Sequence, residues 1–178
     1  MENSIVIYYS RTGNNKYIAE KIAGSLHCDI EALRPRLNIF PLLLFNISAG
    51  NRSIKHNLQQ YDRVILCGPV WMGKLISPLQ NFITRHGNNI AQLYFITCCG
   101  GSPQKPADQS GYLKVFETVG NLLGNKCSGC EALPVSFIVP DAKTNQEVMQ
   151  VRLNDAVFTG EIKSRYDNFI RKICGLEM

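Results

Sequence analysis

Six residues rich in hydroxyl and amide groups follow an unbroken apolar run. The run occupies residues 5–9, and Ser-Arg-Thr-Gly-Asn-Asn occupies residues 10–15, directly before an amphipathic stretch. This order predicts a strand, a turn and the amino end of a helix. The N–H groups at that end lack intrahelical partners and lie at the positive end of the helix dipole, so they can hold a phosphate. Ser10, Thr12 and Asn15 can add side-chain donors to this site.

The same six residues also allow a simpler interpretation. Ser, Thr, Asn and Gly are the usual residues of turns and helix N-caps, so an ordinary strand-to-helix loop stays open at this point. The spacing does not match G-x-x-x-x-G-K-[ST], and no G-x-G-x-x-G follows a predicted strand. A phosphate-bearing ligand is therefore predicted to be a mononucleotide.

Two further loops follow apolar runs in the same way. The run at residues 64–67 ends in Gly-Pro-Val-Trp-Met-Gly at residues 68–73, which contains Trp71, the only tryptophan in the chain. The run at residues 93–96 ends in Thr-Cys-Cys-Gly-Gly at residues 97–101. In an open parallel α/β sheet, ligands bind outside the carboxyl ends of the strands, where the strand order reverses. We therefore expect the three loops to meet at one edge of a sheet, with the Trp71 indole available for stacking.

These loops make the chain similar to the flavodoxin family. Residues 10–15 match the family's phosphate-loop pattern S/T-x-T-G-x-T, and residues 61–82, with Tyr-Asp before the strand and Gly-Pro-Val-Trp after it, resemble its second flavin loop. The resemblance implies a flavodoxin-like α/β fold in a single domain, residues 1–178. The implied sheet is doubly wound, five-stranded and parallel, with strand order 2-1-3-4-5, in a three-layer α/β/α arrangement. The resemblance also implies one FMN held non-covalently.

The resemblance assigns FMN contacts to all three loops. The predicted cofactor-binding residues are Ser10, Arg11, Thr12, Gly13, Asn14 and Asn15 in the first loop, Pro69, Val70, Trp71, Met72 and Gly73 in the second, and Thr97, Cys98, Cys99, Gly100 and Gly101 in the third. The first loop is expected to hold the phosphate, Trp71 to cover the ring, and the third loop to offer backbone donors. Cys98 and Cys99 either place a thiol against the ring or allow close approach through their small size. No catalytic acid or base and no metal ligand is predicted.

Three other segments complete the predicted fold. Residues 28–33 are predicted to form an edge strand, residues 131–139 the fifth strand, and residues 112–123 the helix before it. The apolar run at residues 37–47 is too short to span a membrane, which takes about 20 residues. It is predicted either to cover the sheet as the second crossover element or to form an apolar wall beside the flavin that faces a partner or substrate.

The number of cysteines predicts a reducing compartment, and two of the cysteines form a C-x-x-C motif. There are seven, an odd number, and no secretory signal precedes the first predicted strand, so free thiols in a reducing cytoplasm are expected. Cys127 and Cys130 have the C-x-x-C spacing of redox motifs and of half a zinc site. They follow a predicted helix, however, and no helix amino end is available to lower a thiol pKa. With no second C-x-x-C and no histidine cluster, dithiol or metal chemistry is not the favoured interpretation.

The net charge of the chain indicates the sign of the charge that a substrate or partner protein carries. The formal net charge is +5 at pH 7, whereas electron carriers of the flavodoxin type are acidic and steer basic partners. A basic site suits an anionic substrate, a nicotinamide nucleotide or an acidic partner protein. Nucleic-acid binding is not expected, because the lysines and arginines are dispersed along the chain without a basic cluster.

The resemblance implies electron transfer between protein partners as the function. The alternative is an FMN-dependent NAD(P)H reductase of quinones or other small acceptors, and a flavin-binding module with a sensory task stays open. The chain lacks the insertions with which quinone-reducing relatives form dimers, which favours the first class. We expect a cytoplasmic electron-transport flavoprotein, a monomer or weak dimer without a membrane span, that meets a redox partner protein or a small-molecule acceptor. Whether it is itself an oxidoreductase enzyme is left open.

Overall fold

A five-stranded parallel sheet forms the centre of the molecule. The computed structural model describes residues 3–39, 41–42, 45, 47, 49–100 and 111–176. The strands of the sheet are β1 (Ser4–Tyr8), β2 (Asp29–Ala32), β3 (Arg63–Cys67), β6 (Gln92–Cys99) and β7 (Cys127–Pro134). Their spatial order is β2-β1-β3-β6-β7, and every neighbouring pair is parallel. When only the five strands of this sheet are numbered along the chain, β6 is the fourth and β7 the fifth, so the order is the predicted 2-1-3-4-5. The doubly wound topology is confirmed.

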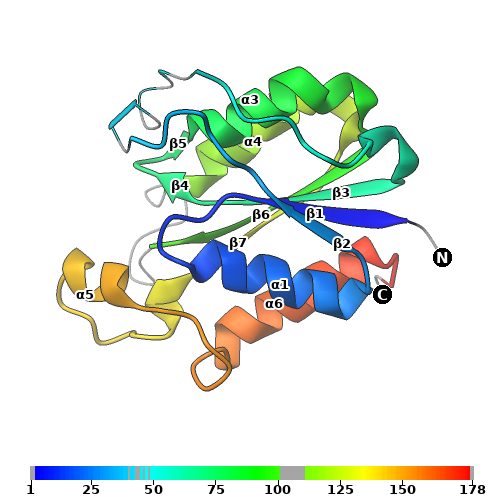
Figure 1. Ribbon diagram of the computed structural model, residues 1–178. Coiled ribbons are helices and arrows are strands. Elements are labelled where there is room, and N and C mark those ends of the chain that lie inside the picture. Colours follow the sequence, from blue (N-terminus) through cyan, green and yellow to red (C-terminus); the bar gives the residue numbers. More distant parts are fainter. Residues whose placement is uncertain are drawn as a thin grey trace.

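Helices cover both faces of this sheet (Figure 1). On one face lie α1 (Asn14–Leu26) and α6 (Gly160–Ile173), and on the other lie α3 (Ser77–His86) and α4 (Tyr112–Leu123). The side chains of β1 alternate between the two cores, since Ile5 and Ile7 pack beneath α3 and α4 while Val6 packs beneath α1 and α6. All three are fully buried, which is why the strand is apolar without alternation from Ile5 to Ile7. The predicted three-layer α/β/α arrangement is confirmed.

The fifth strand of the sheet begins and ends earlier than predicted. Residues 131–139 were expected, but β7 runs from Cys127 to Pro134 and is followed by a single 3-10 turn, Val135–Phe137. The physical reason is that the turn after α4 is very short, so the chain enters the sheet within four residues of the helix. Cys127 and Cys130 therefore lie on an edge strand of the sheet, not in a loop.

A small hairpin fills the second predicted loop. β4 (Val70–Trp71) and β5 (Lys74–Leu75) pair antiparallel, and the two residues between them, Met72 and Gly73, have φ values of 50° and 68°. Positive φ at both central positions is the geometry of the tight turn that matches strand twist. Gly73 rests on the amino end of α4, where a Cβ added to Gly111 would lie 2.5 Å from the Gly73 Cα. The hairpin is thereby fixed against the helix that follows the third loop.

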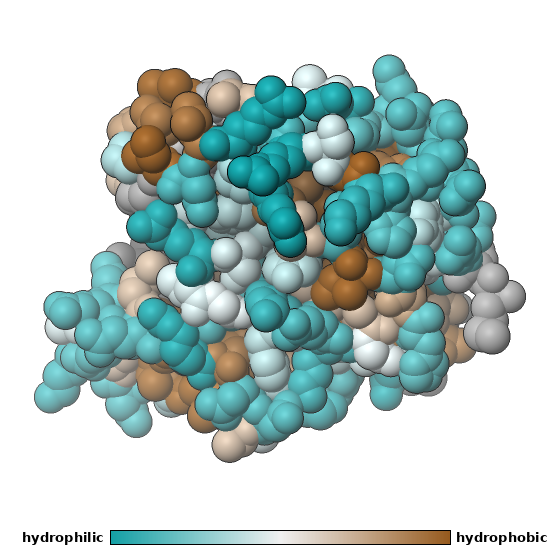
Figure 2. All heavy atoms as spheres, in the orientation of Figure 1, coloured by the Kyte–Doolittle hydropathy of each residue, from teal (hydrophilic) through white to brown (hydrophobic). Residues whose placement is uncertain are grey.

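The connection from β2 to β3 runs past the hairpin and α3 (Figure 1). Within the predicted apolar segment, residues 40, 43, 44 and 46 lie outside the described residues. Of the apolar side chains that are described, Leu37, Ile39, Phe45 and Ile47 are 44%, 52%, 63% and 59% exposed, whereas Leu42 is half-buried. Figure 2 shows an exposed apolar patch at the corner of the molecule where this connection passes the hairpin. This exposure favours the apolar-wall interpretation over packing on the sheet. Across the described ranges, no helix is both long enough and apolar enough to cross a bilayer.

Candidate functional site

The three predicted loops meet at the carboxyl ends of β1, β3 and β6. These strands are neighbours in register, with Tyr8 paired to Cys67 and Cys67 paired to Ile96. The loops enclose a hollow of about 70 Å³. Of the predicted site residues, those that line this hollow are Arg11, Thr12, Asn14, Asn15, Pro69, Val70, Trp71, Cys98, Cys99 and Gly100. Gly101 lies outside the described residues.

The amino end of α1 is open to an anion. The helix begins after Gly13, which has a φ of 100°, and no side chain caps its first N–H groups. Its first turn carries no acidic residue, and a Cβ added to Gly13 would meet nothing within 4 Å. Ser10 shapes the turn itself, because its Oγ accepts a hydrogen bond from the Gly13 N–H at 3.1 Å. The loop therefore forms a cradle with unfilled backbone donors, which fits a phosphate.

The two asparagines of this loop turn their side chains inward. The amide of Asn15 donates to the Cys98 carbonyl oxygen at 3.0 Å and accepts from the Cys98 N–H at 2.8 Å. The amide of Asn14 donates to the Val151 carbonyl oxygen at 3.0 Å and accepts from the Leu153 N–H at 3.0 Å. Both side chains were expected to face the phosphate, and the structure gives them a different use. They tie the first loop to the third and to the segment after the last short helix, α5 (Asn145–Gln150).

Trp71 is held at the rim of the hollow by a second aromatic residue. The two ring centroids of Trp71 and Tyr9 lie 6.2 Å apart, and the rings meet edge to face at 75°. Tyr9 is buried, and its hydroxyl donates to Asn38 Oδ1 at 2.7 Å. The half-buried indole is thus supported from the protein side by a fixed ring. Met72, at the tip of the hairpin, is 82% exposed and does not line the hollow.

The third loop presents backbone instead of thiols. Cys98 packs into the core beneath α1 and α6, and Cys99 packs into the opposite core. Burial raises the pKa of both thiols, that of Cys99 to about 12, so both stay protonated at neutral pH. Thr97 is fully buried. The small-residue interpretation of the two cysteines is therefore favoured over a thiol placed against a ring.

Three apolar residues that sequence reasoning missed complete the hollow, Val135, Val148 and Met149. They come from the turn after β7 and from α5. The sequence does carry a signal for α5, the spacing of Thr144 and Glu147. In the structure Thr144 accepts a hydrogen bond from the Glu147 N–H at 3.3 Å, and its hydroxyl donates to the Glu147 carboxylate at 3.1 Å. This Thr-x-x-Glu pattern is a capping box, which predicts a helix start.

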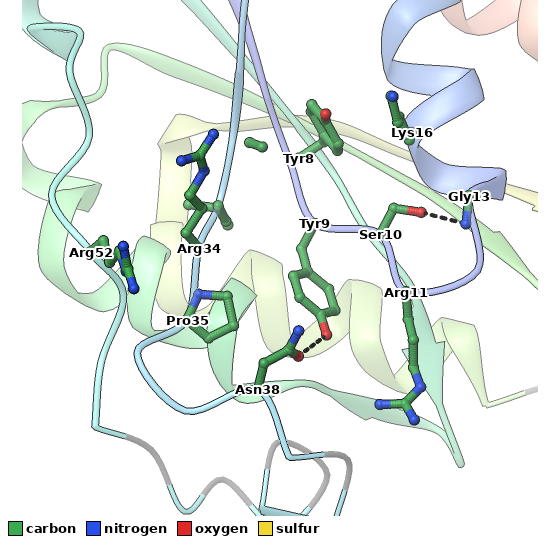
Figure 3. Close-up of a pocket in the computed structure, with 12 residues that line it drawn as sticks. Tyr8, Tyr9, Ser10, Arg11, Gly13, Lys16, Arg34, Pro35, Asn38 and Arg52 are labelled. Atoms are coloured by element: carbon green, nitrogen blue, oxygen red, sulfur yellow. Dashed lines mark hydrogen bonds between the residues drawn. The ribbon is translucent and has the colours of Figure 1, made fainter.

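A larger, basic cavity adjoins the phosphate-type loop on its other side (Figure 3). It has a volume of about 590 Å³ and lies between the ends of β1 and β2. Its lining includes four cationic side chains, Arg11, Lys16, Arg34 and Arg52, and no carboxylate among the described residues. Figure 3 shows Arg34 and Arg52 on one side of the cavity and Lys16 on the other. A cavity of this size and sign suits an anionic small molecule.

Known structures share this architecture. A flavoprotein from Lactobacillus acidophilus NCFM, solved in complex with FMN, is 15% identical with a TM-score of 0.58, over 81% of this chain and 100% of that chain. A flavoprotein from Bacteroides eggerthii is 17% identical with a TM-score of 0.58, over 84% and 94% of the two chains. A flavodoxin from Streptococcus pneumoniae TIGR4 is 12% identical with a TM-score of 0.51, over 97% of both. At these identities the likeness establishes the fold.

Sequence comparison adds the family. No curated protein matches the chain significantly. The family model described as a flavodoxin domain matches residues 44–169, which is more than half of the chain and includes the second and third loops of the site. The match, the strand order and the loop geometry agree. The chain therefore belongs to the flavodoxin domain family.

Proposed function

We propose that this protein binds FMN non-covalently and transfers electrons between protein partners. The observation that carries the proposal is the meeting of an uncapped helix end, a rim tryptophan and a close-packed glycine-containing loop at one sheet edge. FMN, when bound, supplies reversible one- and two-electron chemistry. The protein then has to bind, orient and partly shield it, and no acid or base of the chain is required.

Each loop has a separate role in this proposal. The first-turn N–H groups of α1 and the hydroxyl of Thr12 hold the phosphate, with the exposed Arg11 adding positive charge. The hollow is far smaller than the roughly 300–1,000 Å³ of an ordinary ligand pocket, so the flavin ring lies across its rim against Trp71. The backbone of Cys98 and Gly100 lines the other side of the hollow.

The exposed apolar patch beside the hairpin supports a protein partner. Phe45 of the β2–β3 connection lies under the Lys74 ammonium, 5.2 Å from its ring centroid, so this connection contacts the hairpin that carries Trp71. Leu37, Ile39 and Met72 are exposed in the same region of the chain and hairpin. Apolar side chains gathered on a surface are typical of protein interaction sites.

The experiment is a reconstituted electron-transfer assay with the full chain loaded with FMN. An NADPH-dependent flavoprotein reductase serves as donor and cytochrome c as acceptor. We expect cytochrome c reduction that requires both the reductase and this protein, and that falls when Trp71→Ala releases FMN. Leu122→Ala, an exposed apolar change on α4, is the matched control and leaves the rate unchanged. A protein that retains FMN but adds nothing to the rate rules out the carrier role with this donor and acceptor pair.

A second candidate function is an FMN-dependent NAD(P)H reductase of small acceptors. The basic cavity is the observation that favours it. Arg34 and Arg52 would bind the phosphates of the nicotinamide nucleotide there. If this candidate holds, the FMN-loaded protein oxidises NADPH without any partner, and Arg34→Glu with Arg52→Glu raises KM more than it lowers kcat. Lys163→Glu with Arg171→Glu, both on α6, changes the net charge by the same amount and is the control. Absence of partner-free NADPH oxidation rejects this candidate.

A further inference from the structure

Cys127 and Cys130 lie on the same face of β7, although their spacing predicts opposite faces. In a regular strand, residues three apart point to opposite sides of the sheet. The pairing of β7 with β6 slips here, because Leu93 pairs with Cys127 while the next residue, Tyr94, pairs with Gly129. Ser128 is the extra residue of a β-bulge, which reverses the alternation. As a result both cysteines pack against the core beneath α3 and α4.

The bulge brings the two sulfur atoms together. The Sγ atoms of Cys127 and Cys130 are 3.8 Å apart, and both residues are half-buried at the edge of the sheet. A disulfide needs a separation of about 2.05 Å, so its formation requires the two sulfur atoms to move closer through side-chain rotation. The pair is thus held close as thiols on the edge strand, and both residues are only partly buried.

The surroundings divide the two thiols into different roles. The hydrogen bond between the two thiols, the Gly129 N–H and the Lys172 ammonium together lower the pKa of Cys127 to about 6, against the opposing effect of burial. The same hydrogen bond and burial raise the pKa of Cys130. Lys172 lies across the strand here, since a Cβ added to Gly129 would be 2.9 Å from its Cε and 3.4 Å from its Nζ. Cys127 therefore has the character of an attacking thiolate and Cys130 that of a resolving thiol.

We propose that Cys127 and Cys130 form a redox-active dithiol that a low-molecular-weight disulfide, such as glutathione disulfide, oxidises to an intramolecular disulfide. The Cys127 thiolate attacks one sulfur of glutathione disulfide, whose S–S bond breaks, and the departing glutathione thiolate takes up a proton. Cys130 then loses its proton to water and attacks the Cys127 sulfur, which releases the second glutathione. The second glutathione also leaves as a thiolate and takes up a proton from water. Counted from two protonated protein thiols, the pair gives up two electrons and, through water, two protons, and the glutathione disulfide takes up both to become two thiols.

The other five cysteines do not share these features. Burial raises the pKa of Cys67, Cys98 and Cys99, and burial together with the Asp29 charge raises that of Cys28 to about 11. Cys174 is exposed and provides a single-thiol comparison within the same chain. The dithiol lies at the amino end of β7, whereas the flavin-type hollow lies at the carboxyl ends of the strands. The proposal therefore does not rest on FMN binding.

The test exposes the reduced full-length protein to glutathione disulfide, blocks remaining thiols with iodoacetamide, and maps the peptides by mass spectrometry. We expect the peptide containing Cys127 and Cys130 to lose two hydrogens, reversibly with dithiothreitol, while Cys174 carries a mixed disulfide. With Cys130→Ser, Cys127 should retain glutathione, and with Cys127→Ser, Cys130 should stay a thiol. Far-UV circular dichroism verifies that each variant is folded. The proposal is overturned if both cysteines remain thiols under conditions that modify Cys174, or if either one pairs with another cysteine.

A second measurement isolates Lys172. Lys172→Gln removes the charge beside Gly129 and should slow alkylation of Cys127 slightly at neutral pH, because Lys172 is the smallest of the contributions that lower its pKa. Arg171→Gln, on the next position of α6, changes the net charge equally and should leave that rate unchanged. Equal slowing in the two variants would show that overall charge, and not the position of Lys172, activates Cys127.

Discussion

Asn15 and Cys98 are joined by a pair of buried hydrogen bonds, from the Asn15 amide to the Cys98 carbonyl oxygen at 3.0 Å and from the Cys98 N–H to the Asn15 Oδ1 at 2.8 Å. The Cys67 thiol also donates to the Asn15 carbonyl oxygen at 3.2 Å. One asparagine therefore connects the start of α1 with the ends of β3 and β6. The three loops of the site are positioned by the protein itself, before any ligand arrives.

Asn15→Leu is expected to destabilise the fold. The change leaves the Cys98 N–H and carbonyl oxygen buried without partners, and each such group costs about 1–3 kcal/mol. The midpoint of urea unfolding should fall accordingly, with an unchanged slope. An unfolding midpoint equal to that of the parent would mean that water or another group replaces the asparagine.

Thr12→Val separates ligand binding from stability in the same loop. Thr12 is exposed and lines the hollow, so the loss of its hydroxyl should leave urea unfolding unchanged. Affinity for FMN should fall, because a hydrogen bond to a charged group contributes roughly 1.5–3 kcal/mol. A fluorescence titration measures this affinity, and an unchanged dissociation constant would remove Thr12 from the phosphate site.

Gly111→Ala should disturb the contact between the hairpin and α4. The added Cβ would lie 2.5 Å from the Gly73 Cα, and the φ of 75° is already unfavourable for alanine. Gly50→Ala is the matched control, since its φ is 77° but its Cβ would meet nothing within 4 Å. We expect a lower thermal midpoint for Gly111→Ala than for Gly50→Ala, which carries only the backbone strain, about 1–3 kcal/mol. Equal midpoints would indicate that the hairpin moves away freely.

The thiol pair predicts an unusual pH dependence. Because the pKa of Cys127 is lowered to about 6, its thiolate persists above that pH and is lost as the pH falls through it. The alkylation rate of Cys127 should therefore rise to a plateau near neutral pH, whereas an ordinary thiol continues to gain rate up to about pH 9. Peptide mapping after short iodoacetamide pulses gives the two profiles. A Cys127 profile that rises only at alkaline pH would contradict the assigned hydrogen bond and charge.

The fold could be predicted from the sequence because its signals are local. Continuous apolar runs such as residues 5–9 and 64–67 identify buried parallel strands, and the glycine-containing loops after them identify the site edge. The features that were missed depend on contacts distant in sequence. The bulge at Ser128 exists only through the pairing of β7 with β6, and the inward turn of Asn14 and Asn15 depends on backbone groups more than 80 positions away.

Whether the uncapped end of α1 holds the phosphate of FMN is measured by titrating the full-length apoprotein with FMN and with riboflavin in parallel. Riboflavin carries the same ring without the phosphate, so the difference in affinity reports the cradle alone. We expect saturable quenching of flavin fluorescence at one FMN per chain, with riboflavin bound at least about tenfold more weakly, which corresponds to about 1.4 kcal/mol. Equal affinity for the two flavins, or no saturable binding of FMN, would contradict this expectation.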